Sequence, residues 1–386
     1  MKKIKVMTVF GTRPEAIKMA PVILEMQKHR DTIEPVVAVT AQHREMLDQV
    51  LNLFAIKPDY DLNIMAKGQT LFDITTKAML GLDKVISEAK PDIVLVHGDT
   101  TTTFAGALAA YYHQVKVGHV EAGLRTHDKY SPFPEEMNRK LTGSLADLHF
   151  APTATAQGNL LAENVRDEAI FVTGNTVIDA LHQTVRGDFA FEDEMLRSID
   201  FEGKRIVLVT THRRENLGEP MRHVYKALKR LVEEFKDVEI VFPVHKNPRV
   251  REVVNEELGH LPQVHLIDPL DYEPFANLMS RAELILTDSG GVQEEAPSLG
   301  KPVLVLRDTT ERPEAVAAGT VRLIGTDSER VYSEAKALLT DKDAYKKMAE
   351  SCNPYGDGQS SRRIIEAILY DFGVTDKRPD TFKPGE

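Results

Sequence analysis

Short apolar runs rich in valine and isoleucine alternate along this chain with longer stretches in which apolar residues recur every three or four positions. The first such pair is Lys5–Phe10 followed by Pro14–His29. A short continuous apolar run is typical of a buried strand, whereas the longer spacing is typical of an amphipathic helix. The alternation therefore predicts repeated strand–helix units whose strands are parallel and covered on both faces.

The predicted strands fall into two series. The first consists of 5–10, 35–40, 92–97, 115–120, 148–151 and 170–173, and the second of 206–210, 238–243, 264–267, 284–287, 302–306 and 321–324. A polar, strand-poor segment at 174–187, which begins with a turn signal, separates the two series. We therefore predict an α/β protein with two Rossmann-like, doubly wound parallel-sheet domains in tandem, 1–175 and 176–362.

Composition and charge narrow the class. The 386 residues are 42% hydrophobic and 28% charged, as in folded proteins, and the length suits two domains. The single cysteine, Cys352, excludes an intrachain disulfide framework and a cysteine-based zinc cluster. The apolar run that ends at Phe10 is too short for a signal peptide or a membrane span, and a net charge of -11 disfavours nonspecific nucleic-acid binding. We therefore expect a cytoplasmic protein without a nucleic-acid or membrane partner.

Nearly every unusual polar cluster begins where a predicted strand ends. The clusters are GTRPE at 11–15, HGDT at 97–100, HVEAGLRT at 119–126, THRREN at 211–216, PVHKNP at 243–248 and TDSGG at 287–291. Ligands of open parallel sheets bind outside the carboxyl ends of the strands. We therefore expect these loops to line one edge of each sheet, with the two edges facing each other across an interdomain active-site cleft.

Two of these clusters suit a phosphate-bearing ligand. Ser289, Gly290 and Gly291 offer backbone N–H groups at a predicted helix N-terminus, and the carboxylate of Glu295, about one turn later, can accept from ribose hydroxyls. Arg13 and Lys18 form a cationic pair suited to a pyrophosphate. The alternatives stay open at this point: a capping serine with turn glycines and an acidic first turn, and a surface arginine with an extended lysine. No G-x-G-x-x-G fingerprint is present.

Candidate acid and base groups gather in the first series. Asp99 and Glu121 each follow an apolar strand, where a charge is costly unless it is paired or functional, and Glu135 lies in a proline-stiffened loop. Structural salt bridges are the alternative. His212 ends a strand of the second series and could bind a phosphate or act as an acid, or simply cap the strand end. No H-x-x-x-H or H-E-x-x-H spacing occurs, so we expect no metal.

Taken in order, the polar motifs resemble one known family. The motifs are GTRPEAIKM, QHREM, VHGDTTT, HVEAGLRT, PFPEEMNR, GNTVID, THRREN, PVHKNP, TDSGGVQEE and RDTTERP. Together they strongly resemble the non-hydrolysing UDP-N-acetylglucosamine 2-epimerases of bacteria, over residues 5 to about 366. The resemblance implies two domains arranged as in the GT-B glycosyltransferases, a C-terminal segment, 363–386, that returns to the first domain, and a homodimer. It also implies interconversion of UDP-GlcNAc and UDP-ManNAc for cell-surface polysaccharide precursors, without a cofactor.

The resemblance implies roles for particular residues. Arg13 and Lys18 face the nucleotide-sugar; Ser289, Gly290 and Gly291 hold the diphosphate; Glu295 binds the ribose, Phe275 lies by the uracil, and Arg312 contributes near the ligand. Asp99, Glu121, Glu135 and His212 match the catalytic positions. Gln42, His43 and Arg44 match a site at which some relatives bind a second, activating UDP-GlcNAc. Leu270, Glu45 and Gly68 depart from the family pattern.

The reaction itself constrains the site. The proton at C2 of the sugar is not next to a carbonyl, so it becomes removable only when UDP leaves C1 and positive charge develops there. Elimination to 2-acetamidoglucal and readdition of UDP then inverts C2, which requires a base, an acid and a clamp on UDP. Asp99 and Glu121 are the expected acid and base, Glu135 a partner or alternative, and His212 a contact of the leaving diphosphate.

Three other functions use the same residue types. A GT-B glycosyltransferase needs the same UDP clamp, because a fold does not decide a function. A regulator that binds a nucleotide-sugar without chemistry would need only the clamp. A hydrolysing epimerase would release UDP and free ManNAc. Three carboxylates beside the donor sugar favour an epimerase over a glycosyltransferase, and the sequence alone does not separate a hydrolysing from a non-hydrolysing epimerase.

Overall fold

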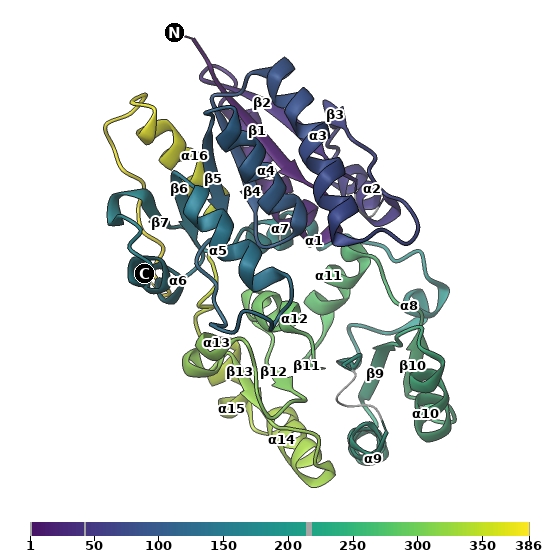
Figure 1. The fold of residues 1–386 in the computed structure, drawn as a ribbon. Helices are drawn as coiled ribbons and strands as arrows, with labels where there is room; N and C mark the ends of the chain where they lie inside the picture. Colours follow the sequence, from purple (N-terminus) through teal and green to yellow (C-terminus); the bar gives the residue numbers. More distant parts are fainter. Residues whose placement is uncertain (1, 42–43, 214–217, 386) are drawn as a thin grey trace. The chain divides into compact units, whose positions relative to one another are not determined.

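The computed structural model describes residues 2–41, 44–213 and 218–385, which divide into two compact units (Figure 1). Unit 1 is formed by the described residues up to Ala180 together with Tyr355–Lys383. Unit 2 is formed by Leu181–Pro354 and residues 384 and 385. Among all the residues that the structure describes, no helix is both long enough and apolar enough to cross a membrane.

Within the described residues, unit 1 is built on a seven-stranded parallel sheet with the order β3-β2-β1-β4-β5-β6-β7. The strands are β1 (Ile4–Phe10), β2 (Ile33–Val39), β3 (Tyr60–Asp61), β4 (Ile93–His97), β5 (Lys116–Val120), β6 (Leu148–Ala151) and β7 (Ile170–Val172). Every residue of β4 is buried, as expected for a strand inside a sheet that helices cover on both faces.

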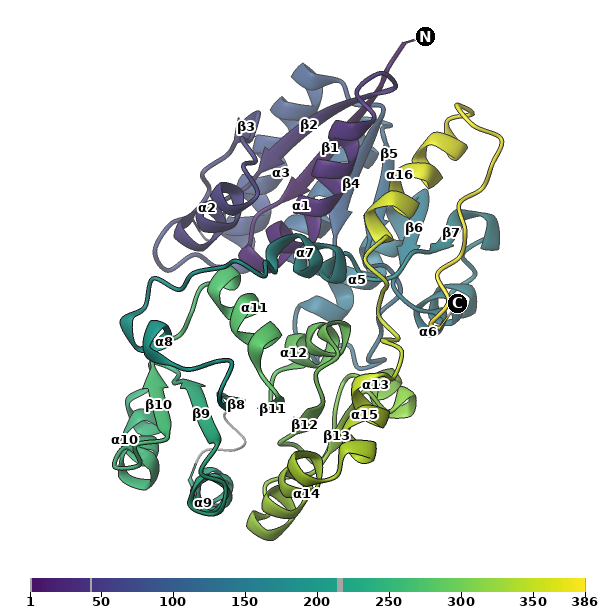
Figure 2. The same ribbon diagram turned by 180° about the vertical axis from the view of Figure 1, so that it is seen from behind.

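The helices of unit 1 lie on both faces of its sheet. They are α1 (Arg13–Lys28), α2 (Arg44–Leu53), α3 (Leu71–Ala89), α4 (Thr101–Tyr112), α5 (Glu135–Leu145), α6 (Ala154–Ala162), η1 (Asp167–Ala169), α7 (Thr176–Thr184) and α16 (Ser360–Asp371). Helices α3, α4 and α5 pack side by side on one face, and α1 packs against α2 and α16 on the other (Figures 1 and 2). The C-terminal helix α16 is thus part of unit 1.

Unit 2 has a six-stranded parallel sheet among its described residues, with the order β10-β9-β8-β11-β12-β13. The strands are β8 (Arg205–Thr210), β9 (Val238–Pro243), β10 (Val264–Ile267), β11 (Leu284–Thr287), β12 (Val303–Val305) and β13 (Val321–Leu323). The helices are α8 (Glu194–Ser198), α9 (Glu219–Glu234), α10 (Pro248–Leu258), α11 (Tyr272–Arg281), α12 (Gly290–Glu295), η3 (Ala296–Leu299), α13 (Pro313–Ala318), α14 (Ser328–Thr340) and α15 (Lys342–Ala349). Helix α9 packs between α10 and α14 over a core that includes Leu228 and Ile240.

The predicted pair of Rossmann-like parallel-sheet domains is confirmed. In each sheet the strand order runs outward in both directions from the first strand, β1 or β8, which is the doubly wound pattern. Ligands of such sheets bind at the carboxyl ends of the strands where the order reverses, between β1 and β4 and between β8 and β11. The motifs GTRPE, HGDT, THRREN and TDSGG begin at or next to the ends of these four strands.

Candidate functional site

A buried carboxylate, Glu15, fixes the loop after β1. It lies in the first turn of α1 and accepts hydrogen bonds from the backbone N–H groups of Gly11 at 3.0 Å and Thr12 at 2.8 Å. It also accepts a 2.7 Å bond from the hydroxyl of Thr100, which caps α4. Burial raises the pKa of Glu15, against the effect of these hydrogen bonds. Glu15 therefore joins the loop after β1 to the loop after β4, and so places Arg13 relative to Asp99.

Glu121 is the first residue after β5, and its backbone is strained. Its φ of 62° lies in the left-handed region that residues other than glycine seldom adopt. The carboxylate forms an ion pair with Nζ of Lys18 and accepts a 2.9 Å hydrogen bond from Nδ2 of Asn175. Only 10% of the side chain is exposed. Strand β5, helix α1 and the segment before α7 thus converge on this one carboxylate.

Asn175 is itself held by the returning C-terminal segment. Its backbone N–H donates to the carbonyl oxygen of Tyr355 at 2.6 Å, and its Oδ1 accepts from the N–H of Val177 at 3.1 Å. Next to it, Gly174 has a φ of 85°, and a Cβ at this position would lie 2.7 Å from the hydroxyl oxygen of Ser360. The amide of Asn175 therefore reaches Glu121 from a rigid support.

Two buried histidines border the carboxylates. Nε2 of His97 lies 3.7 Å from Oε2 of Glu121, and Nε2 of His119 lies 2.7 Å from the carbonyl oxygen of Gly98. Because a carbonyl oxygen only accepts, Nε2 of His119 carries the proton. Burial lowers the pKa of His97 to about 4 and that of His119 to about 3. Both rings are therefore neutral near pH 7.

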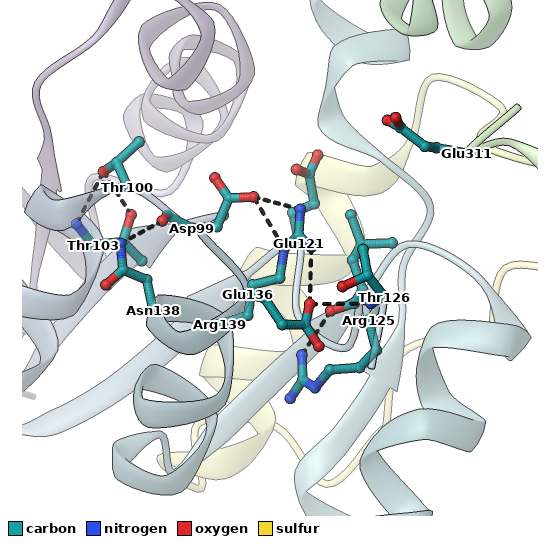
Figure 3. A network of polar contacts seen from close by, with 12 residues as sticks. Asp99, Thr100, Thr103, Glu121, Arg125, Thr126, Glu136, Asn138, Arg139 and Glu311 are labelled. Atoms are coloured by element: carbon teal, nitrogen blue, oxygen red, sulfur yellow. Dashed lines mark hydrogen bonds and ion pairs between the residues drawn. The ribbon is translucent and has the colours of Figure 1, made fainter. Parts of the chain in front are cut away.

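Asp99 follows β4, and two residues of helix α5 bind it (Figure 3). Oδ2 of Asp99 accepts from Nε and Nη2 of Arg139, at 3.0 and 2.7 Å. Nδ2 of Asn138 donates to the carbonyl oxygen of Asp99 at 2.9 Å. Both partners lie on α5, so this helix fixes the side chain and the backbone of Asp99 together.

Helix α5 also carries two neighbouring carboxylates. Glu135, its first residue, is half-buried, and its Oε2 is buried without a hydrogen-bond partner among the described residues. Such an oxygen can accept a proton, or a hydrogen bond from a hydroxyl group of a ligand. Glu136 is fully buried and accepts from the backbone N–H groups of Thr126 at 3.0 Å and His127 at 3.1 Å.

In unit 2 the loops after β8 and β11 are joined by a buried aspartate, Asp288. Its carboxylate accepts from the backbone N–H groups of His212 and Arg213, both at 2.9 Å, and lies 2.8 Å from Nδ1 of His212. Burial acts to raise the pKa of Asp288, but these hydrogen bonds and the nearby imidazole lower it. With Nδ1 directed at Asp288 and 44% of the His212 side chain exposed, Nε2 is the ring atom available to a ligand.

The predicted phosphate loop follows β11. The N–H of Ser289 donates to the Thr287 hydroxyl at 2.9 Å, which corrects the expectation that this amide is open to a ligand. Gly290 and Gly291 begin α12, and the first amides of a helix have no acceptor within it. A Cβ on Gly290 would lie 3.9 Å from Nη2 of Arg312, so the guanidinium borders the loop.

The remaining predicted ligand contacts of unit 2 lie close to this loop. Arg312 forms an ion pair with Glu294, and a Cβ on Gly291 would lie 3.5 Å from Oε1 of Glu295. Glu295 is beside Tyr272, whose pKa is raised well above its ordinary value by burial and by the Glu295 carboxylate. Phe275 is half-buried one turn further along α11.

The other predicted residues lie as follows. Arg13 is half-buried at the start of α1, and no described acidic residue forms an ion pair with it. Gln42 and His43 lie outside the described residues. Arg44 forms ion pairs with Asp48, at 2.9 Å, and with Asp61. Across the described chain no three histidine, cysteine or acidic side chains are grouped closely enough to hold a metal ion.

Comparison with known proteins identifies the family. A family model described as UDP-N-acetylglucosamine 2-epimerase matches residues 25–369. The UDP-N-acetylglucosamine 2-epimerase of Bacillus subtilis is 61% identical over 383 residues, which cover 99% of each chain. A crystal structure of a UDP-N-acetylglucosamine 2-epimerase is 59% identical with a TM-score of 0.93, covering 99% of this chain and 100% of that one. The Neisseria meningitidis enzyme, crystallised bound to UDP-GlcNAc, is 53% identical with a TM-score of 0.83, covering 95% of this chain and 100% of that one. The family predicted from the motifs is confirmed: this chain belongs to the UDP-N-acetylglucosamine 2-epimerase family.

Proposed function

We propose that this enzyme interconverts UDP-GlcNAc and UDP-ManNAc without net hydrolysis, by eliminating UDP to 2-acetamidoglucal and adding it back. The observation that carries the proposal is the pair of carboxylates, Asp99 and Glu121, at the carboxyl ends of the neighbouring strands β4 and β5. The Neisseria meningitidis relative that binds UDP-GlcNAc supports the same substrate for this chain.

The elimination moves one proton and one leaving group. A carboxylate takes the C2 proton as the C1–oxygen bond breaks, the electrons of the C–H bond form the C1–C2 double bond, and UDP leaves with the electron pair of the C1–oxygen bond. In the reverse direction a protonated carboxyl delivers a proton to the opposite face of C2 while a diphosphate oxygen attacks C1. The substrate is neither oxidised nor reduced overall, so proton transfer and a held leaving group suffice.

Asp99 and Glu121 share the base and acid roles, with Glu135 as partner or alternative. Each of the first two forms an ion pair with a cation, Arg139 or Lys18, which holds the carboxylate in place at the end of its strand. Glu121 is held by Lys18, which we expected from the sequence to face the nucleotide-sugar. The ion pair supports a second role for Lys18, which is to keep a positive charge beside the Glu121 carboxylate during proton transfer.

The UDP group must stay bound while it is detached from the sugar, or the reaction ends in hydrolysis. His212, oriented by Asp288, and the first amides of α12 at Gly290 and Gly291 supply hydrogen-bond donors for a diphosphate. The further contacts that we propose come from Arg13, Arg312 and the hydroxyl of Ser289 for the diphosphate, Glu295 for the ribose and Phe275 for the uracil.

The family resemblance extends the proposal beyond the reaction. We expect a homodimer that works in the cytoplasm and supplies precursors of cell-surface polysaccharides. Activation by a second UDP-GlcNAc at residues 42–44 stays a prediction. Of these three residues the structure describes Arg44, which forms ion pairs with Asp48 and Asp61.

The products test the proposal directly. The purified enzyme, incubated with UDP-GlcNAc and followed by ¹H and ³¹P NMR, is expected to form UDP-ManNAc until the two nucleotide-sugars reach a constant ratio. Starting from UDP-ManNAc should lead to the same ratio. Stoichiometric accumulation of free ManNAc and UDP would instead identify a hydrolysing enzyme, and unchanged substrate would identify a binding protein.

A further inference from the structure

We propose that Arg139 and Glu136 are positioning residues that act through Asp99, turning one of its carboxylate oxygens toward the substrate and keeping a positive charge beside the other. The inference rests on the acid–base role proposed for Asp99. Glu136 is part of the motif PFPEEMNR, but the sequence indicated no role for it, and the network around it is drawn in Figure 3.

The first observation is the one-sided grip on Asp99. Arg139 directs two nitrogens, Nε and Nη2, at the same oxygen, Oδ2, at 3.0 and 2.7 Å. Arginine usually binds a structural carboxylate in a fork, with one nitrogen on each oxygen. Here Oδ1 receives no hydrogen bond from any described residue, and 26% of the Asp99 side chain is exposed. One oxygen is therefore held while the other stays accessible for proton transfer.

The second observation is that the guanidinium is itself held from its far side. Nη1 of Arg139 donates to Oε2 of Glu136 at 3.2 Å, one helical turn earlier on α5. A guanidinium is planar and rigid, so fixing two of its edges fixes the direction in which it points. Rotation of Arg139 to meet both oxygens of Asp99 would break the contact with Glu136.

The third observation is the support of Glu136. Its side chain is fully buried, yet its two oxygens accept from the backbone N–H groups of Thr126 and His127 as well as from Arg139. Burial acts to raise the pKa of Glu136, but these bonds together lower it, so the carboxylate is charged at neutral pH. The left-handed backbone at His127, with a φ of 64°, turns its N–H toward this carboxylate. The loop after β5 thus anchors Glu136, Glu136 anchors Arg139, and Arg139 orients Asp99.

The test measures whether Arg139 acts through Asp99. Initial rates of epimerisation give kcat and KM for wild type, Arg139→Met, Arg139→Lys, Glu136→Gln, Asp99→Asn and the double variant Asp99→Asn with Arg139→Met. We expect Arg139→Met to lower kcat about 10²-fold, as for a lost acid–base group, with KM for UDP-GlcNAc changed less than about threefold. Arg139→Lys should recover part of kcat, since it restores the charge but cannot span Asp99 and Glu136. Glu136→Gln should lower kcat about tenfold, because its amide nitrogen cannot accept a hydrogen bond.

The double variant decides whether Arg139 acts through Asp99. If Arg139 acts through Asp99, removing it from the Asp99→Asn enzyme should change kcat less than about threefold. Multiplication of the two single effects would overturn the inference while leaving the proposed function standing. A wild-type rate for Asp99→Asn would instead overturn the role of Asp99 itself. An effect of Arg139→Met on KM alone would also count against the inference.

A matched control separates positioning from general loss of an ion pair. Arg205 grips Asp237 with two nitrogens, at 2.7 and 3.0 Å, but at the start of β8, the end of the strand away from the motifs. Arg205→Met should leave kcat unchanged. If Arg139→Met does not fold, as judged by circular dichroism, the near-isosteric Glu136→Gln decides: a wild-type kcat with intact folding would overturn the relay.

Discussion

Replacing Asp288 with asparagine should disable His212 while leaving its side chain in place. The buried carboxylate of Asp288 accepts from the backbone N–H groups of His212 and Arg213, both at 2.9 Å, and lies 2.8 Å from Nδ1 of the His212 ring, which makes at least three donors. An asparagine amide has one accepting oxygen and an NH₂ group that only donates. At least one of the three bonds is therefore lost, and the NH₂ group faces a donor.

The expected size of the effect follows from these contacts. A buried donor left without a partner costs about 1–3 kcal/mol, and bonds to a charged group lie at the upper end. We expect the backbone turn at His212 to be kept and the imidazole ring to lose its orientation. The cost then appears in the transition state, where about 1.4 kcal/mol lowers the rate tenfold. We therefore expect kcat/KM for Asp288→Asn to fall about 10- to 10²-fold.

Steady-state epimerisation measured by NMR would check this prediction. A suitable control is Asp327→Asn, because Asp327 caps α14 by accepting from the N–H of Arg330 at 2.9 Å, and asparagine caps helices equally well. The control should keep the wild-type rate. A value of kcat/KM for Asp288→Asn within twofold of wild type would refute the idea that Asp288 orients His212 for catalysis.

Three further predictions address the base, the clamp and stability. Asp99→Asn and Glu121→Gln should each slow epimerisation about 10²-fold or more, and a rate near wild type for either variant would remove that carboxylate from the mechanism. Arg13→Ala and Glu295→Ala should each weaken UDP binding by about 1–3 kcal/mol in calorimetry, and unchanged affinity for both would exclude the proposed clamp. Burial lowers the pKa of His149 to about 4, below its value near 6.5 in the unfolded chain, so the unfolded state takes up a proton between these pH values and stability falls as pH drops through that window. In urea unfolding from pH 7.5 to 5, His149→Gln should show a shallower loss of stability on acidification than wild type, and parallel curves would contradict this.

The sequence predicted the sheets and the strand-end positions well, because both depend on local patterns. Apolar runs bounded by polar turns mark buried strands, and a charge one or two residues after such a run marks Asp99 and Glu121. The strand that escaped prediction, β3, has two residues, Tyr60 and Asp61, which pair with Ala38 and Val39 of β2. So short a run carries no periodicity.

Residues that act through tertiary contacts were harder to find. Glu121 meets Lys18 and Asn175, which are 103 and 54 residues away in the chain, and no spacing in the sequence indicates either contact. Nothing in the motif PFPEEMNR distinguishes Glu136 from an ordinary acid in the first turn of a helix, and the proposed positioning role rests on its contacts with the backbone of Thr126 and His127. Asp288 could have been found, because it follows an apolar strand just as Glu121 does.

The fate of the C2 proton tests the central claim most directly. The elimination requires that this proton leave the sugar and that a solvent-derived proton return from the other face. Incubated with UDP-GlcNAc in heavy water, the enzyme should yield UDP-ManNAc that carries deuterium at C2, seen as loss of the C2 proton signal in the NMR spectrum and a gain of one mass unit. Full epimerisation with protium retained at C2 would contradict the account.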